Sequence, residues 1–241
     1  MAISTQSIID RASKLLLDEG SVKRWSEDEL LEFLNMGQNE IVILKPDVSA
    51  TIAEYEAVAG TKQTLPDGSD NYKDAAGNTL PAGVELIRVV RNMGVDGLTP
   101  GRAITIIDPD ILDMLDPDWH NATGAVETLH YVFNNKAPKH FYVYPPKPDL
   151  DPGYFEIAYA SIPFPCSEVS DTTYISLSDI YSNILLDYIL YRALAKENSV
   201  ESNSKAVAYY QSVQNALGLK DNREEMDDPN TNTKYKSKSY K

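Results

Sequence analysis

The spacing of apolar residues changes character twice along this chain. Near both ends, apolar residues recur every three or four positions, which is the spacing of an amphipathic helix. In the middle, the apolar segments are short, β-branched or aromatic, and Pro, Gly, Asn and Asp separate them, as in strands joined by turns. The sequence therefore predicts an α+β fold: a helical bundle core from both chain ends, an inserted antiparallel β domain and an extended C-terminal arm.

Two helices are expected in the N-terminal part. The first should span residues 6–19, with Gly20 as its C-terminal cap. The second should begin at Ser26, because Ser26 and Glu29 have the spacing of a capping box, in which each side chain satisfies a free amide at the helix start. Pro46 should end this helix, since proline cannot continue it.

One glycine, Gly37, lies inside the second predicted helix. Glycine at such a position costs about 1 kcal/mol relative to alanine. It either permits a close contact with another helix or is a tolerated weak point, and the sequence favours neither alternative.

The central part of the chain predicts an antiparallel β domain. Four prolines in the segment 145–152 exclude a central strand there, because proline cannot donate to a sheet ladder. Asp108 followed by Pro109 predicts the start of a short helix that runs through Leu115. The expected strands are 51–58, 85–91, 103–107, 128–133, 141–144 and 154–160.

Two further helices are expected near the C-terminus. The third should run from about residue 178 to residue 198, and apolar residues cover most of its circumference, so it should be buried within one subunit or between subunits. The fourth should pack against it as an antiparallel hairpin and stop at Gly218. The predicted domains are 1–49 (N-terminal helices of the core), 50–177 (inserted β-rich domain), 178–219 (C-terminal helical hairpin) and 220–241 (extended arm).

Composition excludes several classes of function. A net charge of −14 argues against general binding to nucleic-acid phosphates, which requires clustered Lys and Arg. The single cysteine, Cys166, cannot form an internal disulfide and has no basic neighbour to activate it. A reducing compartment is the simple inference, although a secreted protein without disulfides would have the same composition. We find no signal peptide, no membrane-spanning apolar run, no nucleophile elbow and no phosphate-binding glycine loop. We expect neither catalysis nor a cofactor.

One segment has the composition of a metal site. Asp116, Asp118 and His120 could supply oxygen and nitrogen ligands to a divalent ion. The alternative, which we favour, is that these Asp-Pro pairs form helix caps and turns. His130 and His140 lie in strand-like segments and are expected to be structural.

The end of the chain is rich in Lys and Tyr and cannot bury enough apolar surface to fold alone. Three interpretations stay open: contact with nucleic acid, folding onto a protein partner, and a solubilising disordered end. The residues concerned are Lys234, Tyr235, Lys236, Lys238, Tyr240 and Lys241.

A series of short segments resembles one family of proteins. Their order and spacing, between the two helical regions, are similar to those of the head-to-tail adaptor (connector) proteins of short-tailed bacteriophages, and the resemblance covers residues 26–219. A helix segment, LLEFLNMGQNEIVILKP (30–46), matches too. The segments are GTKQTLP (60–66), ELIRVVRN (85–92), DPDWH (116–120), KHFYVYPP (139–146) and YSNILLDYILYRALAKE (181–197).

The resemblance implies a structural virion protein that is not an enzyme. Such adaptors form a ring beneath the portal protein, and the resemblance implies that the ring is a dodecamer. The ring extends the channel through which genomic DNA passes without sequence-specific binding, and it carries the tail nozzle or tail fibres. The alternative is another phage tail or fibre-attachment module that does not contact the portal. Either protein would occupy the virion after assembly in the host cytoplasm, with no membrane partner.

The resemblance also assigns roles to two sets of residues. The Lys- and Tyr-rich end would be the arm that docks on the portal. The third long helix would form the core of the ring through Tyr181, Ile184, Leu185, Tyr188, Tyr191 and Arg192.

Overall fold

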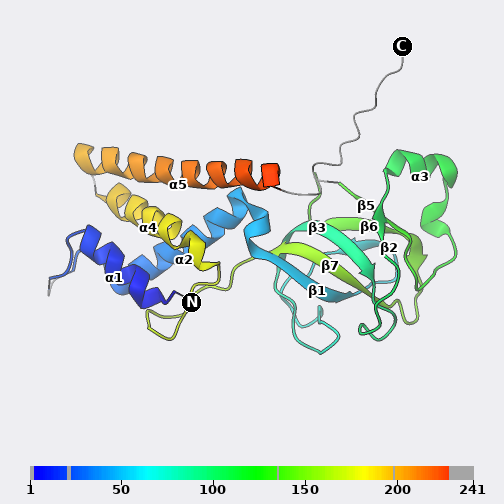
Figure 1. Ribbon diagram of the computed structural model, residues 1–241. Coiled ribbons are helices and arrows are strands. Elements are labelled where there is room, and N and C mark those ends of the chain that lie inside the picture. The colour runs from blue at the N-terminus through cyan, green and yellow to red at the C-terminus, as the bar shows by residue number, and fades with distance from the viewer. Residues whose placement is uncertain (1–2, 21–22, 135, 198, 228–241) are drawn as a thin grey trace, which may run out of the picture. The chain divides into compact units, whose positions relative to one another are not determined.

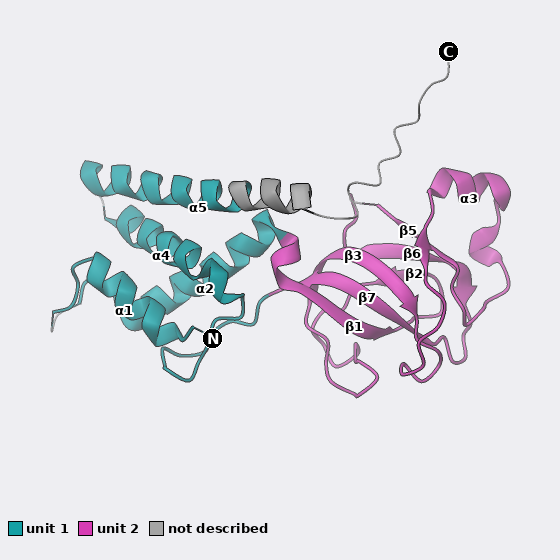
Figure 2. Ribbon diagram, viewed as in Figure 1, with its two compact units in different colours: residues 1–45, 163–241 teal, residues 46–162 magenta. Residues whose placement is uncertain are grey.

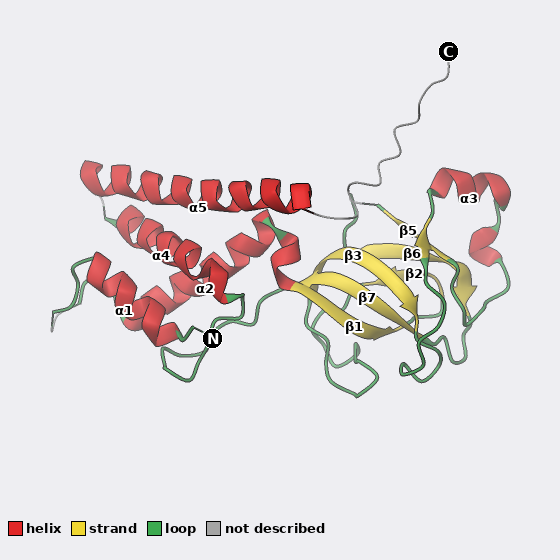
Figure 3. Cartoon of the chain, viewed as in Figure 1, coloured by secondary structure: helices red, strands yellow, loops and turns green. Residues whose placement is uncertain are grey.

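The computed structural model describes residues 3–20, 23–134, 136–197 and 199–227, with side chains through residue 218 (Figure 1). The described chain is an α+β protein with five α-helices and two sheets (Figure 3). It forms two compact units: unit 1 comprises residues 1–45 and 163–241, and unit 2 comprises residues 46–162 (Figure 2). None of the described helices is long and apolar enough to cross a membrane.

Unit 1 is helical. Ser26 caps the second helix as predicted, because its Oγ accepts a hydrogen bond from the Glu29 amide at 3.2 Å. The central helix, α4, contacts the other three helices of the unit and buries residues around most of its circumference. The helices are α1 (Thr5–Leu15), α2 (Glu27–Leu44), α4 (Ser182–Lys196) and α5 (Val200–Asp227).

The prediction that Gly20 caps the first helix is wrong. The helix ends at Leu15, and Leu17 takes the left-handed conformation with φ of 56°. The amide of Asp18 then bonds to the carbonyl of Ser13 at 2.9 Å, which is the pattern of a Schellman motif. This early stop places the Asp18 carboxylate where it accepts hydrogen bonds from the amides of Arg24 and Trp25, and those bonds lower its pKa.

Both C-terminal helices have limits other than those predicted. A 3₁₀ turn, Asp179–Tyr181, precedes α4, which begins at Ser182 instead of residue 178. Gly218 does not end the last helix, which continues to Asp227. Gly218 is exposed, and the residues after it include good helix formers such as Leu, Lys, Arg and Glu, so the helix tolerates the glycine.

Gly37 permits a close helix contact. A Cβ at this position would lie 2.9 Å from Cδ1 of Tyr188 and 3.2 Å from Cδ2 of Leu185, both on α4. Real Cβ atoms essentially never lie as close as 2.9 Å to another heavy atom, so a side chain at this position would push the two helices apart. Of the two alternatives that the sequence left open, the structure supports the close approach.

Unit 2 contains two sheets with a shared core. One sheet has the strand order β1-β7-β3 and the other has the order β2-β6-β5-β4. Aromatic residues dominate the core between them, with Tyr55, Phe141, Phe155 and Tyr159 each at most 1% exposed. The strands are β1 (Ala50–Glu56), β2 (Gly60–Thr64), β3 (Gly83–Asn92), β4 (Thr105–Ile106), β5 (His130–Phe133), β6 (His140–Lys147) and β7 (Tyr154–Ser161).

The second sheet is mixed, so the prediction of a purely antiparallel domain is wrong. Strand β4 pairs with β5 in parallel, through Thr105 with His130 and Ile106 with Tyr131. A parallel pair needs a long crossover, and the segment between these strands supplies one, with helix α3 (Pro109–Leu115) and the 3₁₀ turn η2 (Trp119–Asn121).

The sequence also misplaced two strand segments. Strand β2 was not among the expected strands because two of its buried residues, Thr61 and Gln63, are polar. Strand β6 is central and extends through Pro145 and Pro146, where a strand was excluded. These prolines are tolerated because pairing with β5 ends at Tyr144, and the register with β2 is irregular there.

Lys147, at the end of β6, is a buried cation in unit 2. Its side chain is buried, with the residue 3% exposed. The ammonium donates to the carbonyl of Val126 and lies 4.3 Å from the centroid of the Phe155 ring. Burial lowers the pKa of Lys147 from 10.5 to about 8. The folded protein therefore holds a desolvated charge at neutral pH.

Replacing Lys147 with methionine is expected to raise the free energy of unfolding at pH 7 by about 1–2 kcal/mol. The substitution removes both the desolvation cost of the ammonium and its hydrogen bond, and the desolvation cost is the larger of the two. Between pH 8 and 10.5 the unfolded chain holds a proton that the folded chain releases, so the wild type gains stability and the difference shrinks. Urea unfolding at several pH values measures this, with the exposed Lys73→Met as the matched control. A less stable Lys147→Met protein at pH 7 would show that the polar contacts outweigh desolvation.

Candidate functional site

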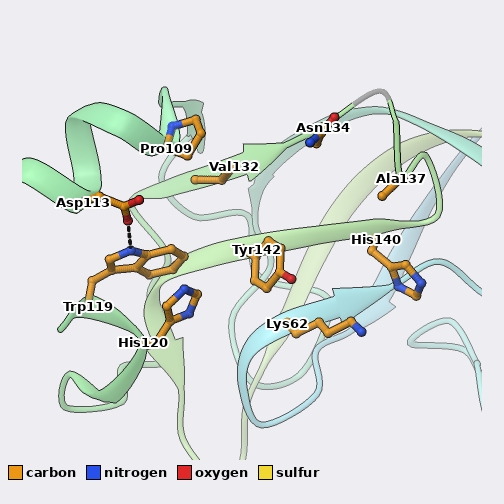
Figure 4. A pocket seen from close by; sticks show the side chains of 10 residues that line it. All are labelled: Lys62, Pro109, Asp113, Trp119, His120, Val132, Asn134, Ala137, His140 and Tyr142. Carbon is orange, nitrogen blue, oxygen red and sulfur yellow. Dashed lines mark hydrogen bonds between the residues drawn. The ribbon is translucent and has the colours of Figure 1, made fainter. Parts of the chain in front are cut away.

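A pocket of about 400 Å³ lies on the outer face of the four-stranded sheet (Figure 4). Strands β2, β5 and β6 provide its floor, and α3 and η2 lie at one end. This volume is within the range of small-ligand sites. The lining residues are Lys62, Pro109, Asp113, Trp119, His120, Val132, Asn134, Ala137, His140 and Tyr142.

Local sequence signals place the helical end of the pocket. Asp108 caps α3 as predicted, since its carboxylate accepts from the amide of Asp110 at 2.9 Å and Pro109 occupies the first turn. Leu112 and Trp119 then pack on Val132 in a small second core. The indole Nε1 of Trp119 donates to the Asp113 carboxylate at 2.8 Å, which fixes the ring at the pocket edge.

The three histidines each lie beside a threonine hydroxyl. Nδ1 of His120 is 2.9 Å from Oγ1 of Thr61, and Nδ1 of His140 is 3.1 Å from Oγ1 of Thr64. His130 has the same arrangement with Thr105, at 2.8 Å, but does not line the pocket. His130 and His140 therefore each make the hydrogen bond expected of a structural residue, and His120 shares this arrangement.

The geometry favours the turn interpretation of the Asp-Pro-Asp segment over a metal site. The Asp118 carboxylate accepts from the Asn121 side chain at 2.7 Å, and the Asp116 carbonyl accepts from the Trp119 amide at 3.0 Å. The His120 ring stacks on Trp119, with centroids 3.7 Å apart. Within the part of the chain that the structure describes, no three His, Cys, Asp or Glu side chains are grouped to hold a metal ion.

Cys166 belongs to a contact inside unit 1. The Asn35 side chain pairs with its backbone, accepting from the amide at 2.8 Å and donating to the carbonyl at 3.0 Å. Gln38 accepts from the Ser176 amide at 2.8 Å. Burial raises the pKa of the Cys166 thiol, which opposes thiolate formation. The Asn and Gln of segment 30–46 thus hold the segment that returns from unit 2.

The residues expected in the ring core lie on or next to α4. Four are buried within the chain itself, and two, Tyr191 and Arg192, are half-buried. The Arg192 guanidinium lies 5.9 Å from the Phe33 ring centroid and makes no ion pair with any described residue. The buried four are Tyr181, Ile184, Leu185 and Tyr188. The expected arm residues, 234–241, lie outside the described residues.

Sequence reasoning did not find the pocket. Its lining combines Lys62 from segment 60–66, Trp119 and His120 from segment 116–120, and His140 and Tyr142 from segment 139–146. These are three of the segments that carried the family resemblance. Their occurrence in these segments could have indicated a common site, but only the fold brings residues so distant in sequence to one face.

Comparison with known proteins agrees with the resemblance. The family model described as SU10 adaptor protein matches residues 3–233, nearly the whole chain. No curated protein matches the sequence. Because the match covers both units, the protein belongs to the SU10 adaptor protein family, a family of phage head-to-tail adaptors with a structural role in the virion.

Proposed function

We propose that this protein forms a ring beneath the portal, extends the DNA channel and provides the platform for the tail nozzle and fibres. The observation that supports this most directly is the family match over residues 3–233. Its partners are the portal protein, tail nozzle or fibre proteins and copies of itself in a dodecamer. It assembles in the host cytoplasm and remains at the head-tail interface of the virion.

In this proposal the parts of the chain divide the work. The helical ring core, predicted as residues 1–49 and 178–219, corresponds to unit 1, and the β-rich domain that faces the tail or the outside, predicted as residues 50–177, corresponds to unit 2, residues 46–162. The half-buried guanidinium of Arg192, which has no carboxylate partner among the described residues, suits a contact with a neighbouring subunit. An adjacent cavity of about 310 Å³, lined in part by Phe33 and Arg192, offers room for such a contact.

The C-terminal arm, predicted as residues 220–241, docks on the portal; residues 220–227 belong to α5, so the arm itself is the segment 228–241. A segment that cannot fold alone but becomes ordered on a neighbouring ring suits an assembly step that waits for its partner. Repeated around a ring, even a weak arm gives high avidity. The net charge of −14 fits a channel through which DNA slides without sticking.

The particle mass of the purified protein, alone and mixed with the portal ring from the same phage, tests this proposal. We expect a species of one chain's mass, 26.8 kDa, that converts to a stable complex on the portal. Deleting residues 228–241, which leaves α5 complete, is expected to lower portal affinity by at least about a hundredfold, because the arms act together.

The alternative function is a tail or fibre-attachment module that does not contact the portal. Failure of the intact protein to join the portal ring under any condition would favour it. Full binding by the truncated protein would instead retain the adaptor role and remove the docking role of the arm.

A further inference from the structure

The pocket on the outer face of the four-stranded sheet is not used in the proposed ring or portal contacts. Its nitrogen donors come from β2, η2 and β6, and an aromatic wall adjoins them (Figure 4). We propose that this pocket binds a single carboxylate carried next to an aromatic or other apolar group on a segment of another protein. The inference concerns unit 2 alone and does not rest on ring formation or portal binding.

Lys62 and His140 can donate to one anion here, because they lie on the same face of the paired strands β2 and β6, while His120 lies on the other side of Tyr142 beside the aromatic wall (Figure 4). Lys62 is exposed and makes no ion pair with a described residue. His120 and His140 use only Nδ1 for their threonine contacts, so Nε2 of each ring remains available. A threonine hydroxyl can donate to Nδ1, and the neutral imidazole then carries its hydrogen on Nε2, facing a ligand as a donor. Charge-assisted bonds to a carboxylate are the strong kind of hydrogen bond.

The wall beside these donors is aromatic and rigid. Tyr142 meets His120 edge-on, with centroids 5.6 Å apart, and meets Trp119 in the same way at 6.3 Å. Trp119 is 3% exposed and is held by Asp113, so this wall has little freedom to move. The Tyr142 ring is 37% exposed and is the surface on which an aromatic or apolar group of the ligand would pack.

The surroundings select a single charge. Asp113 also lines the pocket, and its carboxylate is oriented toward Trp119, away from Lys62 (Figure 4). The segment 108–118 holds further aspartates and no cation, and the chain carries a net charge of −14. A polyanion such as nucleic acid would be repelled by this field, whereas one carboxylate placed at the Lys62 end is attracted.

Two capped dipeptides that differ only in charge test the proposal. The intact protein is titrated with acetyl-Phe-Asp-amide and, separately, with acetyl-Phe-Asn-amide, while the histidine ring resonances are followed by NMR. The chain has 3 histidines, so each reports separately, and His130 lies outside the pocket as an internal reference. We expect the Asp peptide to shift His120 and His140 with a Kd of about 1 mM, typical of a small ligand, and to leave His130 in place.

Two variants separate the pocket from general charge effects. Lys62→Gln is expected to weaken binding of the Asp peptide about tenfold, because it removes a charge-assisted hydrogen bond. Lys73→Gln removes the same charge from a different exposed loop and should leave the Kd unchanged. An unaltered His130 resonance in both variants verifies that unit 2 is folded.

Several outcomes would overturn the assignment. Equal shifts from the Asp and Asn peptides would show that the carboxylate is not recognised. Movement of His130 with the other two would indicate nonspecific binding, and no shift up to about 20 mM would exclude useful affinity. Tighter, Lys62-dependent binding of a short oligothymidylate would assign the pocket to nucleic acid instead.

Discussion

Replacing Asn92 with leucine is expected to lower the free energy of unfolding by about 3–5 kcal/mol. Asn92 is 5% exposed at the end of β3. Its side chain accepts from the Thr128 amide at 2.8 Å and donates to the Thr128 carbonyl at 2.8 Å and to the Arg102 carbonyl at 3.0 Å. Leucine would leave the two backbone groups of fully buried Thr128 without these partners, and each orphaned group costs about 1–3 kcal/mol.

Thr128, whose backbone bonds to the Asn92 side chain, supplies the control for the Asn92 substitution. The Thr128 hydroxyl is buried and has no hydrogen-bond partner in the described structure, so Thr128→Val should be neutral or slightly stabilising. The chain has 2 tryptophans, and Trp119 lies in unit 2, so urea unfolding in a Trp25→Phe background reports that unit. Equal effects of Asn92→Leu and Thr128→Val would contradict the role given to the Asn92 side chain.

Replacing Gly37 with leucine is expected to destabilise unit 1 by about 3 kcal/mol, the upper end of the usual cost of overpacking. A Cβ alone would lie 2.9 Å from Cδ1 of Tyr188, and that ring is buried and packs edge-on against Tyr191. Because the ring cannot move aside easily, α2 and α4 would have to separate. The gain of about 1 kcal/mol in helix propensity is too small to compensate.

Gly218 supplies the matched control for Gly37. It lies within α5, is exposed, and a Cβ there would meet nothing within 4 Å. Gly218→Leu should therefore stabilise the helix by up to about 1 kcal/mol, which is opposite in sign to the effect at Gly37. Fluorescence of Trp25 in a Trp119→Phe background follows unit 1. A tolerated Gly37→Leu would show that the two helices are not held at this distance by packing.

Features controlled by near neighbours in the chain could be predicted from the sequence. Ser26 and Asp108 cap their helices as expected, because a cap needs only a short polar side chain and the amides two or three residues later. The α+β class follows from periodicity, which is also local. The family followed from the order of short segments, which the match over residues 3–233 confirms.

Local rules failed where a distant partner decided the outcome. Gly20 and Gly218 look like helix stops, but α1 ends earlier, in the turn at Leu17, and α5 continues through Gly218 to Asp227. Strand β2 was missed because its inward residues are polar. The prolines of β6 were read as excluding a central strand, since the sequence cannot show where ladder pairing stops.

The candidate pocket shows the same division. The capped helix before Trp119 and the strand that carries Tyr142 could be predicted from the sequence, whereas strand β2 with Lys62 could not. That the pocket side chains share one face, and that β4 pairs with β5 in parallel, became clear only from the tertiary structure. The same is true of the close approach of Gly37 to Tyr188 in unit 1. Caps and periodicity depend on interactions within a few residues, whereas register, helix contact and pocket formation depend on packing between segments far apart in the chain.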